Sequence, residues 1–314
     1  MEEIIDVIKK IENVIYITGH KNADYDSLCS SLAFTIALNK LGKKAYFLIE
    51  EKDKVKLKYF KSEDYMCTSI DEKNYSFILL DSNRISRMPD EFEKYYNSAK
   101  LKINIDHHEG NTTGAEYVLS INDISSTCEI IYELLEKMSI KLDLAISELI
   151  FVGIVSDTDL FCNRTTSRTM KIASNLIELG VNNKMLIEKF YLNKTPDEMR
   201  VISDMVSKMR YDKFHYIVIN MDEDPYNKVD YITISKKCMP ILFSNEEIKV
   251  LMVCMNFNGK IKGEIRSRGN INVAKLAKLL IGGGHTNASG FSNKKRVSEI
   301  IEITNKYLED IENE

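Results

Sequence analysis

A chain of 314 residues exceeds the usual size of one domain, so we expect two domains. The formal net charge of −4 argues against a large non-specific nucleic-acid surface, because such surfaces are normally basic. The first ten residues lack the basic start and apolar block of a signal peptide, and no stretch is long enough to span a bilayer. Six scattered cysteines without a CxxC pair favour free thiols in a reducing compartment. We therefore expect a cytoplasmic protein with no membrane partner.

The first half of the chain alternates short apolar strands with helices. Residues 14–18 form a β-branched apolar run that is typical of a buried strand. Ser27 is a candidate cap for a helix that ends at Gly42. Further strands are expected at 44–49, 75–80 and 102–105. This strand–helix–strand pattern predicts an α/β domain with a parallel sheet.

Acidic and imidazole side chains follow the ends of these strands. The carboxyl ends of parallel strands line the crevice in which open sheets bind ligands. The candidates are His20, Asp24 and Asp26 after the first strand, Asp81 after the third, Asp106, His107 and His108 after the fourth, and Asp157 after an apolar helix. Carboxylates with a few imidazoles suit Mn²⁺, and also Mg²⁺ or Fe²⁺, better than a structural zinc site. Two cations that share a carboxylate would relieve the repulsion among these acids and promote in-line attack on phosphorus.

The second half of the chain has a different pattern. Residues 182–210 are charged and helical, with a helix-start signal at 195–198. Strands are expected at 214–220, 250–256 and 261–266, followed by helices at 273–280 and 294–313. Between these two helices lies Gly282-Gly283-Gly284-His285, in which successive glycines let backbone N–H groups approach an anion. A flexible turn is the alternative for the glycines, and a surface ion pair is the alternative for Arg266, which could otherwise fork onto a phosphate.

These motifs resemble those of a known superfamily. His20-x-x-x-Asp24-x-Asp26, Asp81, Asp106-His107-His108 and Ser156-Asp157 resemble, in order, the four motifs of the DHH phosphoesterases. Arg266-Ser267 and the triple-glycine-histidine resemble the associated DHHA1 domain. The resemblance implies a parallel-sheet DHH domain at 1–188, a helical connector at 189–210 and a smaller DHHA1 domain with a mixed sheet at 211–314. It also implies an active site in the cleft between the two domains.

The resemblance further implies a role for each matched residue. One metal would be held by His20, Asp24 and Asp81, and the other by Asp26, Asp81, His107 and Asp157. Asp81 would bridge the two ions, Asp106 would orient a histidine, and His108 would contact the phosphate and protonate the leaving oxygen. Substrate would be bound by Arg266, Ser267, Gly283, Gly284 and His285. The chain departs from the common pattern at Ala23, Cys29 and Asp159, and none of these positions is an expected ligand.

The compact two-domain length points to the group of nanoRNases, pAp phosphatases and stand-alone cyclic-dinucleotide phosphodiesterases. We expect a Mn²⁺-dependent enzyme with two ions that hydrolyses short oligoribonucleotides or linear dinucleotides to mononucleotides, and also 3′-phosphoadenosine 5′-phosphate. Long duplex nucleic acid is not an expected partner, and a homodimer is common in this group. Two alternatives stay open: a cyclic di-AMP phosphodiesterase, and a catalytically idle nucleotide sensor, against which the complete set of ligands weighs.

Overall fold

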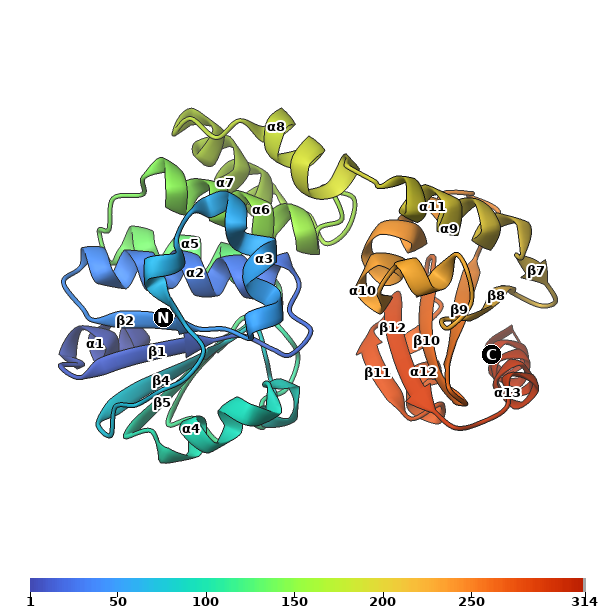
Figure 1. Cartoon of the computed structure of the whole chain (residues 1–314), viewed down its shortest axis with the longest axis horizontal. Coiled ribbons are helices and arrows are strands. Elements are labelled where there is room, and N and C mark those ends of the chain that lie inside the picture. Colours follow the sequence, from blue (N-terminus) through green and yellow to red (C-terminus); the bar gives the residue numbers. More distant parts are fainter. Residues whose placement is uncertain (313–314) are drawn as a thin grey trace. The chain divides into compact units, whose positions relative to one another are not determined.

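The computed structural model describes residues 1–312, which form two compact units (Figure 1). The first unit spans Met1–Leu192, and the second begins at Asn193. Within the described residues, no helix is both long enough and apolar enough to cross a membrane. The six cysteines are free thiols, as expected, and four of them are buried.

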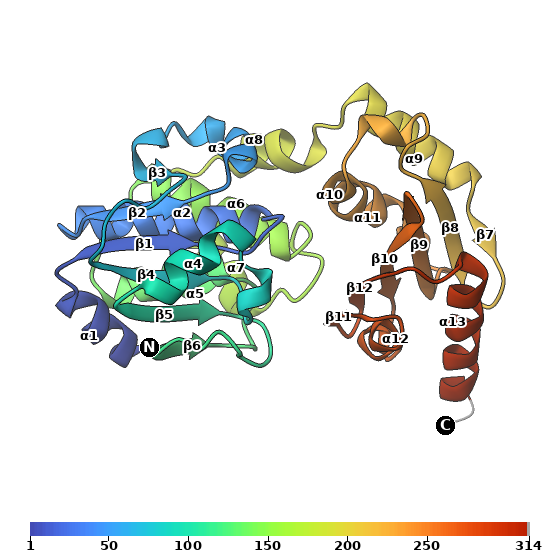
Figure 2. The ribbon, with the colours of Figure 1, turned by 60° about the horizontal axis from the view of Figure 1, so that its bottom comes forward.

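The first unit contains a parallel sheet of six strands, whose order β3-β2-β1-β4-β5-β6 runs from top to bottom in Figure 2. The strands are β1 (Val14–Thr18), β2 (Ala45–Leu48), β3 (Met66–Cys67), β4 (Tyr75–Leu80), β5 (Leu101–Asp106) and β6 (Tyr117–Ser120). The register sets Thr18 opposite Leu79, and Leu80 opposite Ile105. Strands β1, β4 and β5 therefore end at the same edge of the sheet, where the polar residues that follow them come together.

Helices cover both faces of this sheet. Side chains alternate along its strands, so neighbouring residues of one strand pack against helices on opposite faces. Ile15 and Ile17 of β1 pack in the main core with α2 (Tyr25–Lys40), α5 (Thr127–Lys137) and α6 (Leu144–Asp157), while Tyr16 packs on the opposite face with α4 (Glu93–Ser98). The other helices of the unit are α1 (Glu2–Lys10), α3 (Lys54–Leu57), α7 (Ser167–Glu178) and α8 (Asn183–Ile187). Helix α6 is apolar on every side and mostly buried, and it ends at Asp157.

The second unit contains a mixed sheet of six strands in the order β11-β12-β10-β9-β8-β7. The strands are β7 (Arg210–Tyr211), β8 (His215–Asn220), β9 (Val250–Phe257), β10 (Lys260–Ser267), β11 (Gly282–His285) and β12 (Ala288–Asn293). Only β8 and β9 are parallel among the neighbouring strands of this sheet as described. The expected fold class, an α/β protein with a parallel-sheet domain followed by a smaller domain that contains a mixed sheet, is confirmed.

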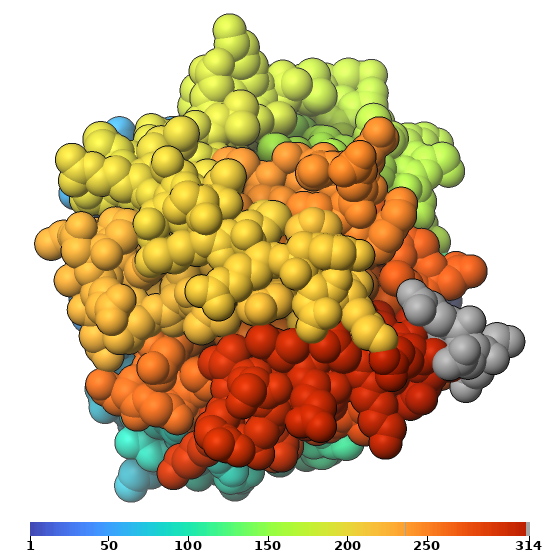
Figure 3. All heavy atoms as spheres, turned by 90° about the vertical axis from the view of Figure 1, so that its right-hand side faces the viewer, coloured from blue at the N-terminus to red at the C-terminus, as the bar shows by residue number. Residues whose placement is uncertain are grey.

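Alternating side chains of β9 divide the core of the second unit in two. Leu251 and Val253 pack with α9 (Pro196–Ser207) and α11 (Met239–Leu242), whereas Met252 packs with α12 (Val273–Leu279) and α13 (Val297–Glu312). A short helix, α10 (Tyr231–Thr233), lies between β8 and α11 in the chain. Helix α13, red in Figure 3, lies against the gold segment around β7 and β8, where Asn305 donates a 2.8 Å hydrogen bond to Asp212.

Three local predictions differ from the structure or lie beyond it. Asp24, not Ser27, caps α2, because the Asp24 carboxylate accepts from the backbone N–H of Ser27. The glycine-rich segment, for which a flexible turn was the alternative, is the edge strand β11, because it pairs antiparallel with β12. The expected final helix is α13, and residue 313, at its expected end, lies outside the described residues.

Candidate metal centre

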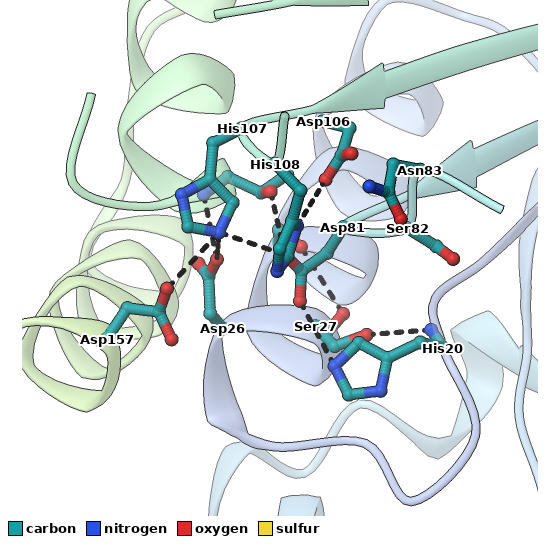
Figure 4. A network of polar contacts seen from close by, with 12 residues as sticks. His20, Asp26, Ser27, Asp81, Ser82, Asn83, Asp106, His107, His108 and Asp157 are labelled. Atoms are coloured by element: carbon teal, nitrogen blue, oxygen red, sulfur yellow. Dashed lines mark hydrogen bonds and ion pairs between the residues drawn. The ribbon is translucent and has the colours of Figure 1, made fainter. Parts of the chain in front are cut away.

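Asp81 occupies the tip of β4, between the residues that follow β1 and β5 (Figure 4). Its φ of 54° lies in the left-handed region, which aspartate tolerates better than most residues. The side chain of Asn104 donates 2.9 Å hydrogen bonds to the carbonyls of Leu79 and Ser82, on either side of Asp81. The backbone N–H of Asp81 donates to Ile105 at 3.0 Å. These bonds hold a strained residue in place, and such strain is common at functional sites.

The first group of candidate ligands joins Asp81 to the loop after β1. The Nε2 atom of His20 lies 3.4 Å from Oδ2 of Asp81 and 3.8 Å from Oδ1 of Asp24. The other ring nitrogen of His20 lies 2.9 Å from the carbonyl of Lys21, a contact that favours a proton on Nδ1 and leaves Nε2 as the ligand atom. Ser27 supports this loop, because its hydroxyl accepts a 3.0 Å hydrogen bond from the backbone N–H of His20.

The second group surrounds the buried ring of His107. Its Nε2 atom lies 3.2 Å from Oδ2 of Asp157, 3.4 Å from Oδ1 of Asp81 and 4.0 Å from Oδ2 of Asp26. Neither ring nitrogen makes a hydrogen bond with any described residue. A buried imidazole that faces three carboxylates without a hydrogen bond fits a set of ligands to a shared cation, because buried polar atoms are otherwise paired. Asp81 therefore presents one carboxylate oxygen to each group.

The buried acids change the titration of both imidazoles. Burial alone would lower the pKa of His20, but the neighbouring carboxylates raise it to about 10. Burial also opposes the charged form of His107, whose pKa the surrounding acids nevertheless raise to about 9. Burial, followed by the charges of Asp81 and Asp157, raises the pKa of Asp26 well above its usual range. In the metal-free protein, protons on the imidazoles supply the positive charge that a divalent cation would supply when bound.

Asp106 and His108 form a pair beside the two groups. The buried carboxylate of Asp106 lies 2.7 Å from Nδ1 of His108, which fixes the orientation of that imidazole. Asp106 thus orients the second histidine of the motif, His108, and not the buried His107. Nδ1 of His108 also lies 3.8 Å from Oδ1 of Asp81, the oxygen that faces His107.

The expected substrate-binding residues of the second unit share one end of its sheet. Arg266, Ala288 and His285 lie opposite one another on β10, β12 and β11, and Glu264, Gly290 and Gly283 form the row two positions along, on the same face of the sheet. The guanidinium of Arg266 donates a 3.0 Å hydrogen bond to Glu264. Glu264 is buried and also accepts a hydrogen bond from the hydroxyl of Tyr231. Glu264 is therefore held in place, and its bond with Arg266 fixes the orientation of the guanidinium.

Ser267 and the glycines of β11 have different surroundings. The hydroxyl of Ser267 donates to the carbonyl of Ile271 at 2.6 Å and its side chain is buried, so the geometry supports a role in shaping the loop. A Cβ atom on Gly282 or Gly284 would lie 2.1 Å or 2.6 Å from a backbone oxygen of β12. A Cβ atom on Gly283 would meet nothing within 4 Å. Packing inside the unit therefore requires glycine at two positions and leaves Gly283 unexplained.

Several residues that complete the site were not predicted from the sequence. Both oxygens of Asp26 accept backbone N–H groups from the start of α5, at Thr127 and Cys128. Three further residues act through others: Ser27, Tyr231 and Glu264. The bond of Ser27 to His20 depends on the loop geometry, Tyr231 is 33 positions from Glu264, and Glu264 lies two positions before Arg266 on the same strand. Ser125-Ser126-Thr127 was the available signal, because a run of hydroxyl residues before a helix is typical of a helix N-terminus.

The donor set fits divalent cations. His20, Asp24 and Asp81 form one cluster, Asp26, His107 and Asp157 a second, and Asp81, His107 and His108 a third that overlaps the other two, each with its ligand atoms within 4.8 Å of one another. Carboxylate oxygens with one or two imidazoles per cluster are typical ligands of Mn²⁺, Mg²⁺ or Fe²⁺. The ring nitrogens of His107, which make no hydrogen bond with the described residues although Nε2 lies among carboxylates, give the same indication.

Comparisons with known proteins agree with this geometry. Residues 14–154 match the DHH family, N-terminal domain, and residues 233–310 match the DHHA1 domain. The parallel sheet, the acid–imidazole centre and these two domains define a hydrolase that acts on phosphoric ester bonds. The chain belongs to the DHH phosphoesterase superfamily and carries a DHHA1 domain in its second half.

Similar proteins cover most of the chain at low identity. The bifunctional oligoribonuclease and PAP phosphatase NrnA of Thermus thermophilus is 25% identical over an alignment of 304 positions, which covers 94% of this chain and 88% of that protein. The cyclic-di-AMP phosphodiesterase GdpP of Bacillus subtilis is 26% identical over 95% of this chain but only 47% of that protein. A crystal structure of an exopolyphosphatase-related protein from Bacteroides fragilis has a TM-score of 0.81 at 22% identity and covers 99% of this chain and 96% of that one. At that identity the likeness supports the fold.

Proposed function

We propose that the chain is a Mn²⁺-dependent phosphoesterase with two ions, which hydrolyses short oligoribonucleotides or linear dinucleotides to mononucleotides. A second proposed substrate is 3′-phosphoadenosine 5′-phosphate. The observation that carries the proposal is the carboxylate of Asp81, which faces His20 with one oxygen and His107 with the other, each at 3.4 Å. The net charge of −4 favours small substrates, and the oligoribonuclease and PAP phosphatase named above shares nearly the whole length of the chain.

In this proposal, each group of the first unit has a separate task. His20 and Asp24 hold one ion, Asp26, His107 and Asp157 hold the other, and Asp81 contributes to both. Two bound cations would polarise the phosphoryl oxygens and neutralise the charge that develops in the transition state. Asp106 holds the ring of His108, which contacts the phosphate and gives a proton to the leaving oxygen.

We propose that Arg266 and His285 bind a neighbouring phosphate or the end of the nucleotide. Two observations favour this proposal. Glu264 accepts a 3.0 Å hydrogen bond from Arg266 and so orients its guanidinium, and Arg266 and His285 lie in the same row across the sheet. Alternate N–H groups of an edge strand face away from the sheet, so Gly283 or Gly284 would offer one backbone N–H group to the same anion. Among the described residues, nothing would block a Cβ atom on Gly283. A substrate that approaches the backbone closely would explain why glycine stands at this position.

One panel of assays tests this function. Purified protein with Mn²⁺ is given pApA, a short RNA, cyclic di-AMP, 3′-phosphoadenosine 5′-phosphate and pyrophosphate. We expect AMP from pApA and mononucleotides from RNA at the highest rates, and little phosphate from pyrophosphate. The His107→Ala and Asp81→Ala variants should lose nearly all turnover. Binding of dinucleotides without turnover of any compound would contradict the enzyme and favour the idle sensor.

A cyclic dinucleotide is the second candidate substrate. The observation that favours it is the likeness to a cyclic-di-AMP phosphodiesterase over 95% of this chain. Opening of cyclic di-AMP at a higher kcat/KM than cleavage of pApA would select this alternative and overturn our first choice. The two substrates share the same scissile bond chemistry, so this outcome would leave the proposed metal centre unchanged.

Two further properties belong to the proposal. We propose a cytoplasmic location, which the six free thiols support, because such thiols persist in reducing compartments. We also propose a homodimer, and light scattering of the purified protein at assay concentrations would measure twice the chain mass of 36.2 kDa if this is right.

A further inference from the structure

The start of helix α5 contacts ligands of both cation groups. The backbone N–H of Thr127 donates to Oδ2 of Asp26 at 2.7 Å, and that of Cys128 donates to Oδ1 of the same carboxylate at 2.8 Å. The hydroxyl of Thr127 donates to Oδ1 of Asp81 at 3.1 Å. Thr127, Asp26 and Asp81 are all buried, so these bonds form away from bulk water. A single residue therefore binds a ligand of the second group with its N–H and the shared ligand with its hydroxyl.

The geometry of the helix explains the bonds to Asp26. The first N–H groups of a helix have no partner within the helix, and its N-terminal end favours negative charge. In α5, Ser126 is the cap and accepts from the N–H of Glu129 at 3.2 Å, which leaves the N–H groups of Thr127 and Cys128 for Asp26. These neutral donors bond to both oxygens of the buried side chain of Asp26.

Glycine lets the helix that carries Asp157 approach this point. A Cβ atom on Gly153 of α6 would lie 2.1 Å from the sulfur of Cys128 and 3.2 Å from Oδ1 of Asp26. A contact of 2.1 Å does not occur between real side chains. The close approach of α6 to α5 therefore brings Asp157 to the same carboxylate that α5 holds.

The hydroxyl of Thr127 has a different task from its N–H. Oδ1 of Asp81, which accepts this bond, is the oxygen that lies 3.4 Å from Nε2 of His107, while Oδ2 lies 3.4 Å from Nε2 of His20. Rotation of the carboxylate would remove one oxygen from one of the two groups. A donor on Oδ1 opposes that rotation, because the hydrogen bond is kept only in the orientation in which each oxygen faces its own group.

We infer that Thr127 is a positioning residue whose hydroxyl holds Asp81 in the orientation that serves two cations at once. This inference rests on the proposed two-ion site and deepens it. It concerns the binding of the ions before any substrate is present. Partners outside the immediate ligands of a metal typically change its affinity 10- to 100-fold, and we expect an effect of that size.

The test uses the full chain and two variants of Thr127. Thr127→Val keeps the N–H bond to Asp26 and the branched shape but removes the hydroxyl, and Thr127→Ser restores the hydroxyl. Thr35→Val is the matched control, because Thr35 is also buried and its hydroxyl donates at 2.8 Å to a backbone carbonyl, that of Ser31. Mn²⁺ binding to metal-free protein is followed by calorimetry, and the protein with two equivalents of Mn²⁺ is examined by electron paramagnetic resonance for coupling between the ions.

The inference predicts that Thr127→Val weakens at least one Mn²⁺ binding step about 10- to 100-fold and changes the coupled spectrum. Thr127→Ser and Thr35→Val should resemble the parent in both measurements. Parent-like affinity and coupling in Thr127→Val, or an equal loss in Thr35→Val, would overturn the inference. If Thr127→Val does not fold, Thr127→Ala removes the same hydroxyl and is judged by the same criteria.

The outcome is separable from that of the proposed function. A parent that binds two coupled Mn²⁺ ions but hydrolyses no phosphoester, together with a weakened Thr127→Val, would refute the function and uphold the role of Thr127. An active parent whose Thr127→Val variant binds Mn²⁺ as the parent does would refute only the role of Thr127.

Discussion

At the scale of single residues, the site depends on side chains that hold other side chains. Asp106 lies 2.7 Å from His108, Thr127 donates to Asp81, and Glu264 accepts from Arg266. Each of these holding residues is buried, whereas Arg266 and His108 are partly exposed. A group that must meet a substrate in one orientation benefits from such support, because less freedom is lost on binding.

The hydrogen bond between Arg266 and Glu264 leads to a prediction for the Glu264→Gln variant. Glutamine keeps the size of the side chain but removes the charge that attracts the guanidinium, so Arg266 becomes less well oriented. We expect KM for pApA to rise several-fold, and Mn²⁺ affinity to stay at the parent value. Steady-state kinetics and calorimetry measure the two quantities.

Glu299→Gln is the matched control for this change, because Glu299 of α13 pairs at 3.3 Å with Arg296, the residue before that helix. It should leave KM unchanged. A Glu264→Gln variant with parent-like KM, or with reduced Mn²⁺ affinity, would show that Glu264 does not act through Arg266.

At the scale of elements, strand and helix ends bring the site together. Strands β1, β4 and β5 end in register, and α5 begins and α6 ends at the same place. In the second unit, β11 is an edge strand whose residues are exposed. Exposed N–H groups of an edge strand are available for an external partner.

The glycines of β11 give a matched pair of substitutions. Gly284 has a φ of 143°, and a Cβ there would lie 2.6 Å from Ala288, so Gly284→Ala should lower the melting temperature. Gly283 has space for a Cβ and no such φ, so Gly283→Ala should keep the melting temperature and raise KM for pApA. Thermal unfolding and kinetics of both variants check this. Parent-like KM in Gly283→Ala would remove the argument for close approach of substrate at this strand.

The sequence predicted the elements better than the contacts between them. The strand ends at Asp81 and Asp106 followed from short apolar runs, because burial on both faces leaves a clear composition signal. The strand β11 was missed, because glycines have low strand propensity and its pairing with β12 depends on contacts across the sheet. The bond from Thr127 to Asp81 joins residues 46 positions apart, and no local pattern encodes it.

At the scale of the whole molecule, the metal centre links ion binding to stability. Buried acids and imidazoles at β1, β4, β5 and α6 repel or attract one another according to the protons and cations present. With the pKa of His20 near 10 and that of His107 near 9, against 6.5 for a free imidazole, the folded metal-free protein binds protons more tightly than the unfolded chain. The stability of the fold therefore depends on which protons and cations are bound at the metal centre.

This linkage predicts how stability depends on pH. Stabilisation by the two imidazolium groups is complete below about pH 6.5 and is lost as pH rises toward 9 and 10, through the folded pKa values. The raised pKa of Asp26 acts in the same direction. The melting temperature of metal-free protein should fall between pH 6.5 and 9, and saturating Mg²⁺ should abolish the fall. A melting temperature that is flat or rises over this range without metal would contradict the charge balance.

The central claim is that Asp81 joins two ion-binding groups, and anomalous diffraction at the manganese edge tests it most directly. Crystals of the parent protein grown with Mn²⁺ should show two anomalous peaks. One peak should lie among His20, Asp24 and Asp81, and the other among Asp26, His107, Asp157 and Asp81. A single peak, or a pair of peaks that do not both contact Asp81, would contradict the account.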